Sequence, residues 1–412
     1  MTAPLDLSPS ATEEEAAAAA ERWLHENLPP AWLKGVLDGD REAVAAQRAD
    51  ADGLRAWYAL LGDSGLATPS WPREHGGLGL SADAAGAISD VLLRYSADFD
   101  SPAFIGRGLA GPTILVHGTE EQKRQHLPGI RRGEVQWCQL FSEPGAGSDL
   151  ASLAARAERQ ADGTWLVNGQ KVWNSYAHFA DWGILMARTD PTRPKHRGIS
   201  YFLVDMRTPG VEPRPLRQMN GEAEFNEVFL TDVRLPEDAL LGEVNNGWAV
   251  GITTLMQERN GLSGRPGVGA ARGEELARLA ARTGTWADPL LRDKLLAYVV
   301  EERVLQMTTV RAFVETGTGP VGAEGSIRKL ISSWLQEQAG VLAAEADPVG
   351  VLGRPAGSPL NSSAYDFLSM KQTSIAGGTS EIQRNIIAER LLRLPKDPDP
   401  EKDVPFNQRT RG

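Results

Sequence analysis

The sequence has almost no cysteine and no excess of basic charge. Cys138 is the only cysteine among 412 residues, so no disulfide can form within one chain, and a reducing cytoplasm is the expected compartment. It lies in the apolar run "VQWCQLF", where a free thiol usually behaves as a small buried hydrophobe. There are 43 Lys and Arg against 54 Asp and Glu, which gives a net charge of -11. This balance argues against a nucleic-acid or anionic-membrane surface, because such surfaces need clustered basic residues.

Several other signals are missing. No apolar stretch is long enough to cross a bilayer, and the first residues lack the basic start and apolar run of a secretory signal. The six histidines are scattered without an i,i+4 pair, so no metal site is expected. No GxGxxG follows a strand-like run, so a Rossmann dinucleotide site is not indicated. The length is sufficient for two or three domains.

The pattern of the sequence changes twice along the chain. Helical periodicity dominates residues 11–130, short Val-, Phe- and Trp-rich runs separated by Gly and Pro follow from residue 134, and helical periodicity returns at Gly247. This order favours segregated domains over alternating βαβ units. We therefore expect a multi-domain α+β protein: an N-terminal helical domain over residues 1–133, a central β-barrel or sandwich over 134–245 and a C-terminal helical bundle over 246–412.

Three local signals give more specific predictions. Thr119 and Gln122 have the spacing of a capping box, and Pro128 should end the helix that they begin. Asn168-Gly169 lies between two strand-like runs and predicts a hairpin. Near the C-terminal end, Ser380 begins a second capping-box pattern, which starts a helix in "GGTSEIQRNIIAERL".

Six segments together resemble the acyl-CoA dehydrogenase family. "WPREHGGLGL", "GTEEQKRQHLPGIRRGE", "LFSEPGAGSDLA", "NGQKVWNS", "FNEVFLTDVRLPEDALLGEVNNGW" and "GGTSEIQRNIIAERLL" occur in the order that the family shows, between about residues 50 and 394. The resemblance implies N-terminal helices, a central β-barrel, a C-terminal four-helix bundle and FAD as the cofactor. It also implies removal of the α-proton and β-hydride of an acyl-CoA thioester, giving a trans-2-enoyl product. Electron-transfer flavoprotein would then accept the electrons, in fatty acid or lipid catabolism such as β-oxidation.

The resemblance also assigns residues to the cofactor. Gly145 and Gly147 of "SEPGAGSD" let the backbone turn tightly near a ligand, although the string alone could be an ordinary turn. Trp173 would shield the flavin from solvent, although it could instead pack in the core, and Ser175 would donate near flavin N5. Ser148 is implied to hold the FAD pyrophosphate or the CoA. The other residues implied to contact FAD are Leu140, Phe141, Ser142, Thr379 and Glu381.

The catalytic base has to be found separately. The reaction needs a base near the thioester α-carbon and donors for the thioester oxygen. Many family members carry a Glu in the loop before "GTS", where this chain has Gly377. The Gly377 backbone N–H can still donate to the thioester oxygen, and the resemblance implies Gly378 as a substrate-binding residue. Glu258 and Arg259 follow an apolar helical stripe. Relatives specific for isovaleryl-CoA and long-chain substrates resemble this arrangement, which implies Glu258 as the base and Arg259 as a substrate-binding residue.

Two segments depart from the family pattern and leave alternatives open. The Arg-x-x-Phe-Gly segment expected near residues 281–291 is absent, and "EADPVGVLGRPAG" only loosely resembles Gln-x-x-Gly-Gly-x-Gly. In the family both bind the adenosine of FAD across a subunit interface. A homotetramer or dimer and a heteromer with a related chain therefore both remain open.

Other interpretations also remain on the sequence alone. Glu258 and Arg259 could form an ordinary ion pair, and Ser380 could be a plain helix cap. The chain could be a non-catalytic or half-site subunit of a heteromeric dehydrogenase, or a flavin-dependent monooxygenase. The intact "SEPGAGSD" and Glu258 favour the dehydrogenase, and the space left by Gly377 slightly favours a branched, long or bulky acyl group.

Overall fold

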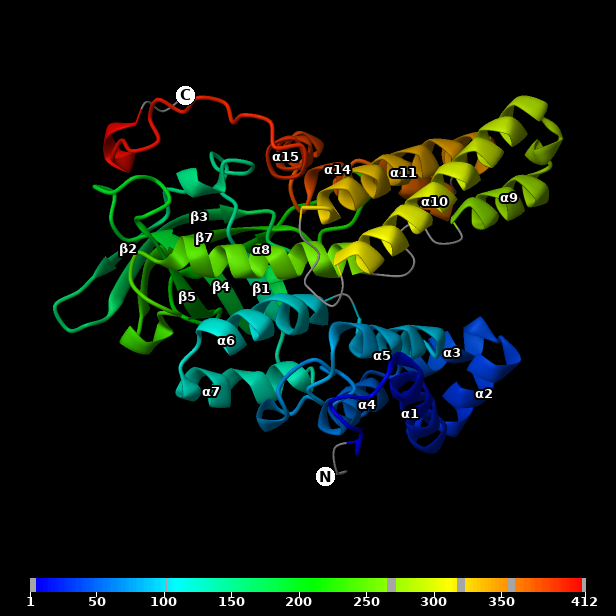
Figure 1. Cartoon of the computed structure of the whole chain (residues 1–412), viewed down its shortest axis with the longest axis horizontal. Helices are drawn as coiled ribbons and strands as arrows, with labels where there is room; N and C mark the ends of the chain where they lie inside the picture. Colours follow the sequence, from blue (N-terminus) through cyan, green and yellow to red (C-terminus); the bar gives the residue numbers. More distant parts are fainter. Residues whose placement is uncertain (1–4, 101, 265–271, 317–322, 354–359, 410–412) are drawn as a thin grey trace. The chain divides into compact units, whose positions relative to one another are not determined.

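The computed structural model describes residues 5–100, 102–264, 272–316, 323–353 and 360–409, without the side chains of residues 259–264 and 312–316. The chain divides into two compact units, which are described separately (Figure 1). Unit 1 comprises Met1–Leu216, Glu224–Thr254 and Glu401–Gly412, and unit 2 comprises Arg217–Ala223 and Leu255–Pro400. Helix α8 (Gly247–Gly264) begins in unit 1 and ends in unit 2.

Unit 1 begins with helices, as the sequence predicts. Thr12 and Thr119 each form a capping box, which satisfies free N–H groups at the starts of α1 and α7. The helices before residue 104 bury an apolar cluster, in which the Trp57 ring packs near those of Trp23 and Trp32. The helices are α1 (Glu13–Asn27), α2 (Pro30–Asp38), α3 (Arg41–Ala49), α4 (Ala51–Ser64), η1 (Arg73–His75), α5 (Ala82–Arg94), the π-helical η2 (Ile105–Ala110), α6 (Gly111–His117) and α7 (Glu120–Arg131).

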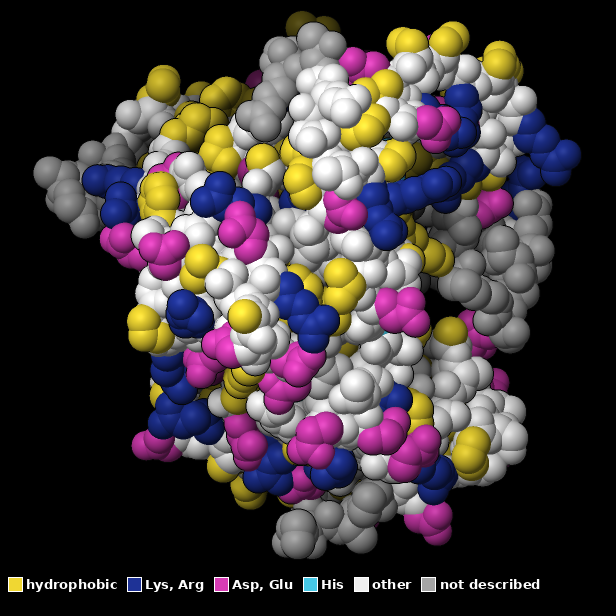
Figure 2. Space-filling model, turned by 90° about the vertical axis from the view of Figure 1, so that its left-hand side faces the viewer, with side chains coloured by type: hydrophobic (Ala, Val, Ile, Leu, Met, Phe, Trp, Pro, Cys, Tyr) yellow, Lys and Arg dark blue, Asp and Glu magenta, His cyan; other side chains and the backbone are white. Residues whose placement is uncertain are grey.

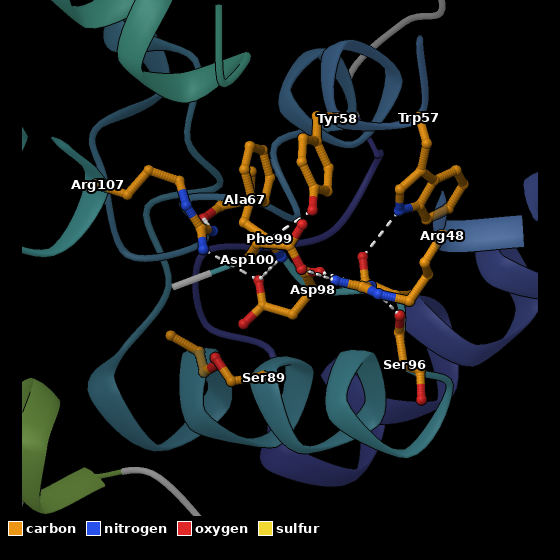
Figure 3. Close-up of polar contacts among 12 residues, drawn as sticks. Arg48, Trp57, Tyr58, Ala67, Ser89, Ser96, Asp98, Phe99, Asp100 and Arg107 are labelled. Carbon is orange, nitrogen blue, oxygen red and sulfur yellow. Dashed lines mark hydrogen bonds and ion pairs between the residues drawn. The ribbon is translucent and has the colours of Figure 1, made fainter. Parts of the chain in front are cut away.

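A polar network fixes residues 96–100, between α5 and η2 (Figure 3). Arg48 pairs with the Asp100 carboxylate and donates to the Asp98 carbonyl at 3.1 Å. From the other side, Arg107 donates to the Asp98 carboxylate at 3.1 Å and lies 3.9 Å over the Phe99 ring. The segment is therefore held by two guanidinium groups from separate helices.

The middle of unit 1 is a curled, mostly antiparallel sheet. Within the described residues it has seven strands in the order β1-β4-β2-β3-β7-β6, with β5 also paired to β4. Only the β1–β4 and β2–β4 pairs are parallel. The strands are β1 (Trp137–Leu140), β2 (Arg156–Arg159), β3 (Trp165–Val172), β4 (Trp182–Arg188), β5 (Ile199–Asp205), β6 (Val211–Pro215) and β7 (Asn226–Leu235), with short 3-10 turns η3 (Leu150–Ser152), η4 (Ala177–Phe179) and η5 (Glu237–Ala239).

The hairpin predicted at Asn168-Gly169 is wrong. Both residues lie inside β3, where the register against β7 shifts between Val167 and Gly169. A Cβ atom at Gly169 would lie 2.5 Å from the Cβ of Ala155, so the glycine is needed for a close backbone approach. The Asn168 amide donates to the Asp232 carboxylate at 3.1 Å across the sheet. The Asn-Gly pair therefore serves a bulge and not a turn.

The prediction that Pro128 ends its helix is also wrong. Helix α7 continues to Arg131 with Pro128 inside it. Proline cannot donate to the preceding turn, which weakens a helix interior. Here Leu127 and Ile130 are both buried, so packing of the last turn offsets the lost hydrogen bond.

Residues 401–409 return to unit 1 and pack beside the loop after β4. The Phe406 N–H donates to the Arg193 carbonyl at 2.9 Å, within the short turn η8 (Phe406–Gln408). The buried Arg188 guanidinium lies 3.7 Å from the centre of the Phe406 ring, and it donates to the Ala151 and Leu153 carbonyls. This tail is therefore part of the packed structure of unit 1.

Unit 2 is helical, as predicted. Helix α10 packs along α11, which also contacts α9, α13 and α15 (Figure 1). The core of unit 2 includes Leu276, Leu295, Tyr298, Leu335 and Leu342. The helices are α9 (Arg272–Thr283), η6 (Thr285–Ala287), α10 (Pro289–Thr316), α11 (Gly325–Ala346), α12 (Pro348–Leu352), α13 (Ser362–Ser369), α14 (Gln372–Ile375), α15 (Ser380–Ile386) and the π-helical η7 (Ile387–Leu391).

The described surface carries charged side chains of both signs, and the single cysteine lies in the interior. Lys and Arg side chains are interspersed with Asp and Glu over the face in Figure 2. Cys138 is buried, as expected, and burial raises the pKa of its thiol. Among the described residues, no helix is long and apolar enough to cross a membrane, and no three His, Cys, Asp or Glu side chains form a metal-binding group.

Candidate functional site

The segment after β1 carries the first predicted flavin contacts. Leu140 is buried at the end of β1, Phe141 is buried edge-to-face with Tyr201 at 5.7 Å between ring centres, and Ser142 is partly exposed. The Ser142 carbonyl accepts a hydrogen bond from the Val172 N–H at 2.9 Å. This bond joins the segment after β1 to the end of β3, which brings the two predicted flavin walls together.

The second wall begins directly after β3. Trp173 has a φ of 62° and is 62% exposed, so it does not pack in the core. A bulky residue with a left-handed backbone is strained, and such strain is common at ligand sites. Ser175 is partly exposed two residues later, and Asn174 between them is buried and donates to the Gln139 carbonyl at 2.7 Å. Among the described residues, the Asn174 Oδ1 atom has no hydrogen-bond partner.

A buried ion pair supports both walls from behind. Lys171 is 0% exposed, and its Nζ atom donates to Glu143 Oε1 at 2.7 Å and to the Phe141 carbonyl at 3.0 Å. Glu143 also accepts the backbone N–H groups of Ala154 and Ala155 at 2.6 and 2.9 Å. Burial lowers the pKa of Lys171, and the charge of Glu143 opposes that effect. The sequence interpretation missed this pair; a lysine beside valine in a strand was the available signal.

The loop of residues 143–148 presents its backbone to solvent. Glu143 and Ala146 exchange backbone hydrogen bonds at 3.0 Å, which makes a tight turn. A Cβ atom placed on Gly145 or Gly147 would have no heavy atom within 4 Å, and Ser148 is exposed. The exposed Trp173 ring, this open loop and the unpartnered Asn174 oxygen fit a flat cofactor ring with a polar tail.

The second group of predicted residues lies in unit 2, in the loop before α15. Gly377 and Gly378 have φ values of 66° and 93°, a left-handed backbone that glycine adopts without strain. The N-cap of α15 is Thr379, whose hydroxyl accepts the Ile382 N–H at 3.3 Å, and not Ser380 as predicted. Both residues carry a hydroxyl, and the left-handed Gly378 directs the chain so that Thr379 takes the cap.

Two buried side chains hold this loop. Gln383 donates to the Gly377 and Gly378 carbonyls at 3.1 and 3.2 Å, and Lys329 of α11 donates to the Gly378 carbonyl at 2.6 Å. The sequence interpretation did not assign either residue to the site. Lys329 recurs at helical spacing with the buried Ser326 and Ser333, which is the signal that could have identified it.

Two of the predicted site residues in unit 2, Glu258 and Glu381, carry charges that affect the pKa of Lys329. Glu258 is partly exposed on α8. Burial lowers the pKa of Lys329, while the charges of Glu258 and Glu381 raise it. The pKa of the exposed Glu381 is lowered because the carboxylate accepts its own backbone N–H and the Thr379 hydroxyl. The side chain of Arg259 lies outside the described residues.

The chain is similar to known proteins over most of its length. The acyl-CoA dehydrogenase N-terminal, middle and C-terminal domain families match residues 10–134, 138–233 and 245–392. Acyl-CoA dehydrogenase IpdE1 of Mycobacterium tuberculosis is 39% identical over 393 residues, which cover 93% of this chain and 98% of that protein. Acyl-CoA dehydrogenase FadE34 of the same organism is 42% identical over 364 residues, covering 87% of this chain but only 49% of that longer protein.

A solved structure has a similar fold. The "Tcur3481-Tcur3483 steroid ACAD" superposes with a TM-score of 0.74 at 27% identity, covering 93% of this chain and 98% of that chain. The identity to IpdE1 extends over nearly the full length of that protein and includes all three matched domains. The chain therefore belongs to the acyl-CoA dehydrogenase family of FAD-dependent oxidoreductases.

Proposed function

We propose that the chain catalyses the α,β-dehydrogenation of an acyl-CoA thioester to the trans-2-enoyl-CoA, with Glu258 as the base. The observation that carries this proposal lies in unit 2. Glu258 on α8 and the Gly377–Gly378 loop belong to this same unit, and Lys329 Nζ donates to the Gly378 carbonyl at 2.6 Å. Burial lowers the pKa of Lys329, and the charge of Glu258 opposes this effect. A base and an oxyanion-binding loop in one region are what proton abstraction beside a thioester requires.

The residues have separate roles in this proposal. Glu258 takes the α-proton, and the Gly377 N–H donates to the thioester oxygen as negative charge develops there. Arg259, Gly378 and Ser148 bind the substrate. When bound, FAD supplies the acceptor for the β-hydride at its N5 position.

The cofactor contacts are assigned from the described geometry and the family resemblance. The exposed Trp173 ring would exclude water from the flavin face, and the Ser175 hydroxyl would donate near N5. The other residues proposed to hold FAD are Leu140, Phe141, Ser142, Ser148, Thr379 and Glu381. We also propose domain boundaries at residues 133/134 and 245/246.

The substrate is proposed to be a CoA thioester with a bulky, steroid-like acyl group. The 27% identity to a steroid ACAD supports this class, as does the absence of a side chain at Gly377. Electron-transfer flavoprotein is the proposed electron acceptor, and lipid catabolism of the β-oxidation type in the cytoplasm is the proposed setting.

A second candidate is a half-site subunit of a heteromer with a related chain. The chain spans 49% of FadE34, and the similar solved structure is named for the pair Tcur3481-Tcur3483. The missing adenosine-binding motifs of residues 281–291 and 345–357 support the same candidate. In this form the partner chain would supply the adenosine-binding part of the FAD site, for which this chain lacks the motifs.

The test is anaerobic reduction of the bound flavin by a panel of acyl-CoA thioesters, from short and branched to long and steroid-like. One class should bleach the oxidised-flavin absorbance, and Glu258→Gln should slow this step by about 10²–10⁴-fold while FAD stays bound. Glu274→Gln is the matched control, because Glu274 pairs with Arg278 at 3.7 Å on the exposed surface of unit 2. A colourless preparation that takes up no FAD would support the half-site subunit, and near wild-type activity of Glu258→Gln would refute the proposed base.

A further inference from the structure

Two buried side chains hold one peptide group of unit 1 from opposite sides. Arg188 Nε donates to the Leu153 carbonyl at 3.1 Å. The Ala154 N–H donates to Glu143 Oε2 at 2.6 Å. This carbonyl and this N–H belong to the same planar trans peptide, in which they point in opposite directions. The peptide is therefore fixed between a cation on one side and a carboxylate on the other.

This peptide closes the loop that carries predicted flavin and CoA contacts. The loop begins at Glu143 and returns to the Glu143 carboxylate at Ala154. Lys171 donates to the same carboxylate at 2.7 Å, and at 3.0 Å to the Phe141 carbonyl on the first predicted flavin wall. The arrangement of the loop and of this wall therefore depends on how firmly the far side of the peptide is held.

Arg188 holds that far side with its whole guanidinium group. The residue is 3% exposed, and each of its three nitrogen atoms donates to a backbone carbonyl. Nε binds the Leu153 carbonyl, Nη1 the Lys195 carbonyl at 3.0 Å and Nη2 the Ala151 carbonyl at 2.7 Å. These partners are uncharged, so the buried cation keeps a cost of desolvation, and burial lowers the pKa of Arg188 to about 10. The edge of the guanidinium is thus occupied, and its flat face is left for another group.

The C-terminal tail, residues 401–409, covers this face. Arg188 Cζ lies 3.7 Å from the centre of the Phe406 ring, which is a cation–π contact. The Phe406 N–H donates to the Arg193 carbonyl at 2.9 Å, so the backbone of the tail fixes the place of the ring. The negative face of the ring therefore offsets part of the desolvation cost of the cation.

We propose that Phe406 is a positioning residue for the cofactor: by covering Arg188, it holds the peptide between residues 153 and 154 and keeps the loop of residues 143–154 in the arrangement that binds FAD. This inference rests on the proposed FAD contacts of the loop and of Trp173. A loop that adopts the binding arrangement for only a fraction of the time lowers the apparent FAD affinity by that fraction. Phe406 can therefore influence FAD binding without touching the cofactor.

The test measures the dissociation constant of FAD in the holoenzyme, with its partner chain if one is needed for FAD binding, by flavin fluorescence on dilution. Phe406→Leu keeps an apolar side chain over Arg188 but removes the ring face, so the constant should rise by about 3–10-fold. Phe406→Tyr keeps the ring and should bind FAD with wild-type affinity. Arg188→Lys keeps the charge but loses the planar edge that binds three carbonyls, so it should weaken FAD binding at least as much as Phe406→Leu.

Phe99→Leu is the matched control. The Phe99 ring centre lies 3.9 Å from Arg107 Cζ, so this variant also removes a ring from the face of an arginine in unit 1. Arg107 donates to the Ala67 carbonyl at 2.9 Å and to the Asp98 carboxylate at 3.1 Å, and both partners lie outside the loop. Phe99→Leu should lower thermal stability and leave FAD affinity unchanged. Thermal unfolding of every variant sets a temperature at which all of them are folded when FAD binding is compared.

The outcomes separate the inference from the proposed cofactor site. If Phe406→Leu lowers thermal stability but binds FAD with wild-type affinity, or weakens binding no more than Phe99→Leu, the tail is only structural and the inference is wrong. Trp173→Ala is measured in parallel. If it weakens FAD binding while Phe406→Leu does not, the proposed contacts stand and the inference fails alone. If neither variant weakens binding, the proposed flavin wall is wrong and the inference falls with it. Weaker binding in both, restored by Phe406→Tyr in the tail, supports both.

Discussion

Each unit contains a buried lysine that binds a backbone carbonyl beside a predicted site residue. In unit 1, Lys171 donates to the Phe141 carbonyl and directly to the Glu143 carboxylate at 2.7 Å. In unit 2, Lys329 donates to the Gly378 carbonyl and is influenced by the charges of Glu258 and Glu381. The same residue type therefore completes a buried ion pair in one unit and holds a loop carbonyl in the other.

The difference lies in how the charge is compensated. The Glu143 carboxylate accepts hydrogen bonds from Lys171 and from two backbone N–H groups, so these groups hold the segments that carry the predicted flavin walls. Removing one partner of such a buried charge pair is strongly destabilising, because the other charge is left buried without compensation. Lys329 instead donates to an uncharged group, the Gly378 carbonyl, at 2.6 Å. The comparison predicts that losing the lysine costs more stability in unit 1 than in unit 2.

The largest expected effect is on stability. Lys171→Met leaves Glu143 buried without its cation, and the free energy of unfolding should fall by about 3–5 kcal/mol. Urea unfolding of the apoprotein measures this change. Lys34→Met is the control, because Lys34 pairs with Asp38 at 2.6 Å on the exposed surface of unit 1, and its loss should cost at most about 1 kcal/mol. Equal losses in the two variants would show that the Lys171 pair is not specially important.

A buried histidine in unit 1 extends the comparison to a base that is kept neutral. His126 packs against the Trp137 and Trp182 rings, and burial lowers its pKa to about 4. Between pH 6.5 and about 4 the unfolded state binds more protons than the folded state, so stability should fall with falling pH in this window, by about 3 kcal/mol in total. His126→Phe should remove this part of the pH dependence of urea unfolding, and the exposed His178→Gln should keep it. An unchanged slope in His126→Phe would contradict the assignment.

Moving the carboxylate tests whether the loop in unit 2 can replace the base on α8. Gly377 has a φ of 66°, which a Glu can adopt at a cost of about 1–2 kcal/mol. The double variant Glu258→Gln, Gly377→Glu should reduce flavin at least about tenfold faster than Glu258→Gln alone. Gly377→Gln in the same background is the control. No recovery would mean that the loop does not approach the substrate α-carbon.

The smallest expected effect on stability is at the exposed flavin wall. Trp173→Ala removes a ring that is 62% exposed, so the free energy of unfolding of the apoprotein should change by no more than about 0.5 kcal/mol. FAD affinity, measured by flavin fluorescence, should weaken by about tenfold, because the flavin loses the aromatic side chain that is proposed to cover one of its faces. Phe179→Ala removes another exposed aromatic ring of unit 1 and should leave FAD affinity unchanged. Equal affinities in all three proteins would remove Trp173 from the site.

The ordered motifs were enough to predict the family, its fold and the two segments that lie side by side around Ser142 and Trp173. Single local signals were less reliable. Asn168-Gly169 suits a hairpin turn and a bulge equally well, and only the close approach of Ala155 decides between them. Pro128 could end its helix or lie inside it, and either Thr379 or Ser380 could cap α15. The structure around each residue decides between the two possibilities.

The buried cations could not be predicted, because their partners are distant in the sequence. Lys171 is 28 residues from Glu143, and Lys329 is 49 residues from Gly378. Local sequence patterns indicate which face of an element is apolar. They do not indicate which buried polar group on another element needs a hydrogen-bond partner. The roles of Glu258 and of the FAD contacts stay predictions, as do the domain boundaries, and Arg259 lies outside the described side chains.

The packing of Phe406 under Arg188 has a consequence for biosynthesis. The ribosome releases the chain from its N-terminus, so residues 401–409 emerge only after the whole of unit 2 has been made. Until then the Arg188 guanidinium lacks its aromatic cover, although its carbonyl partners on Ala151 and Leu153 are already present. Packing of Phe406 against Arg188 can therefore take place only after the helices between residues 255 and 400 have been translated.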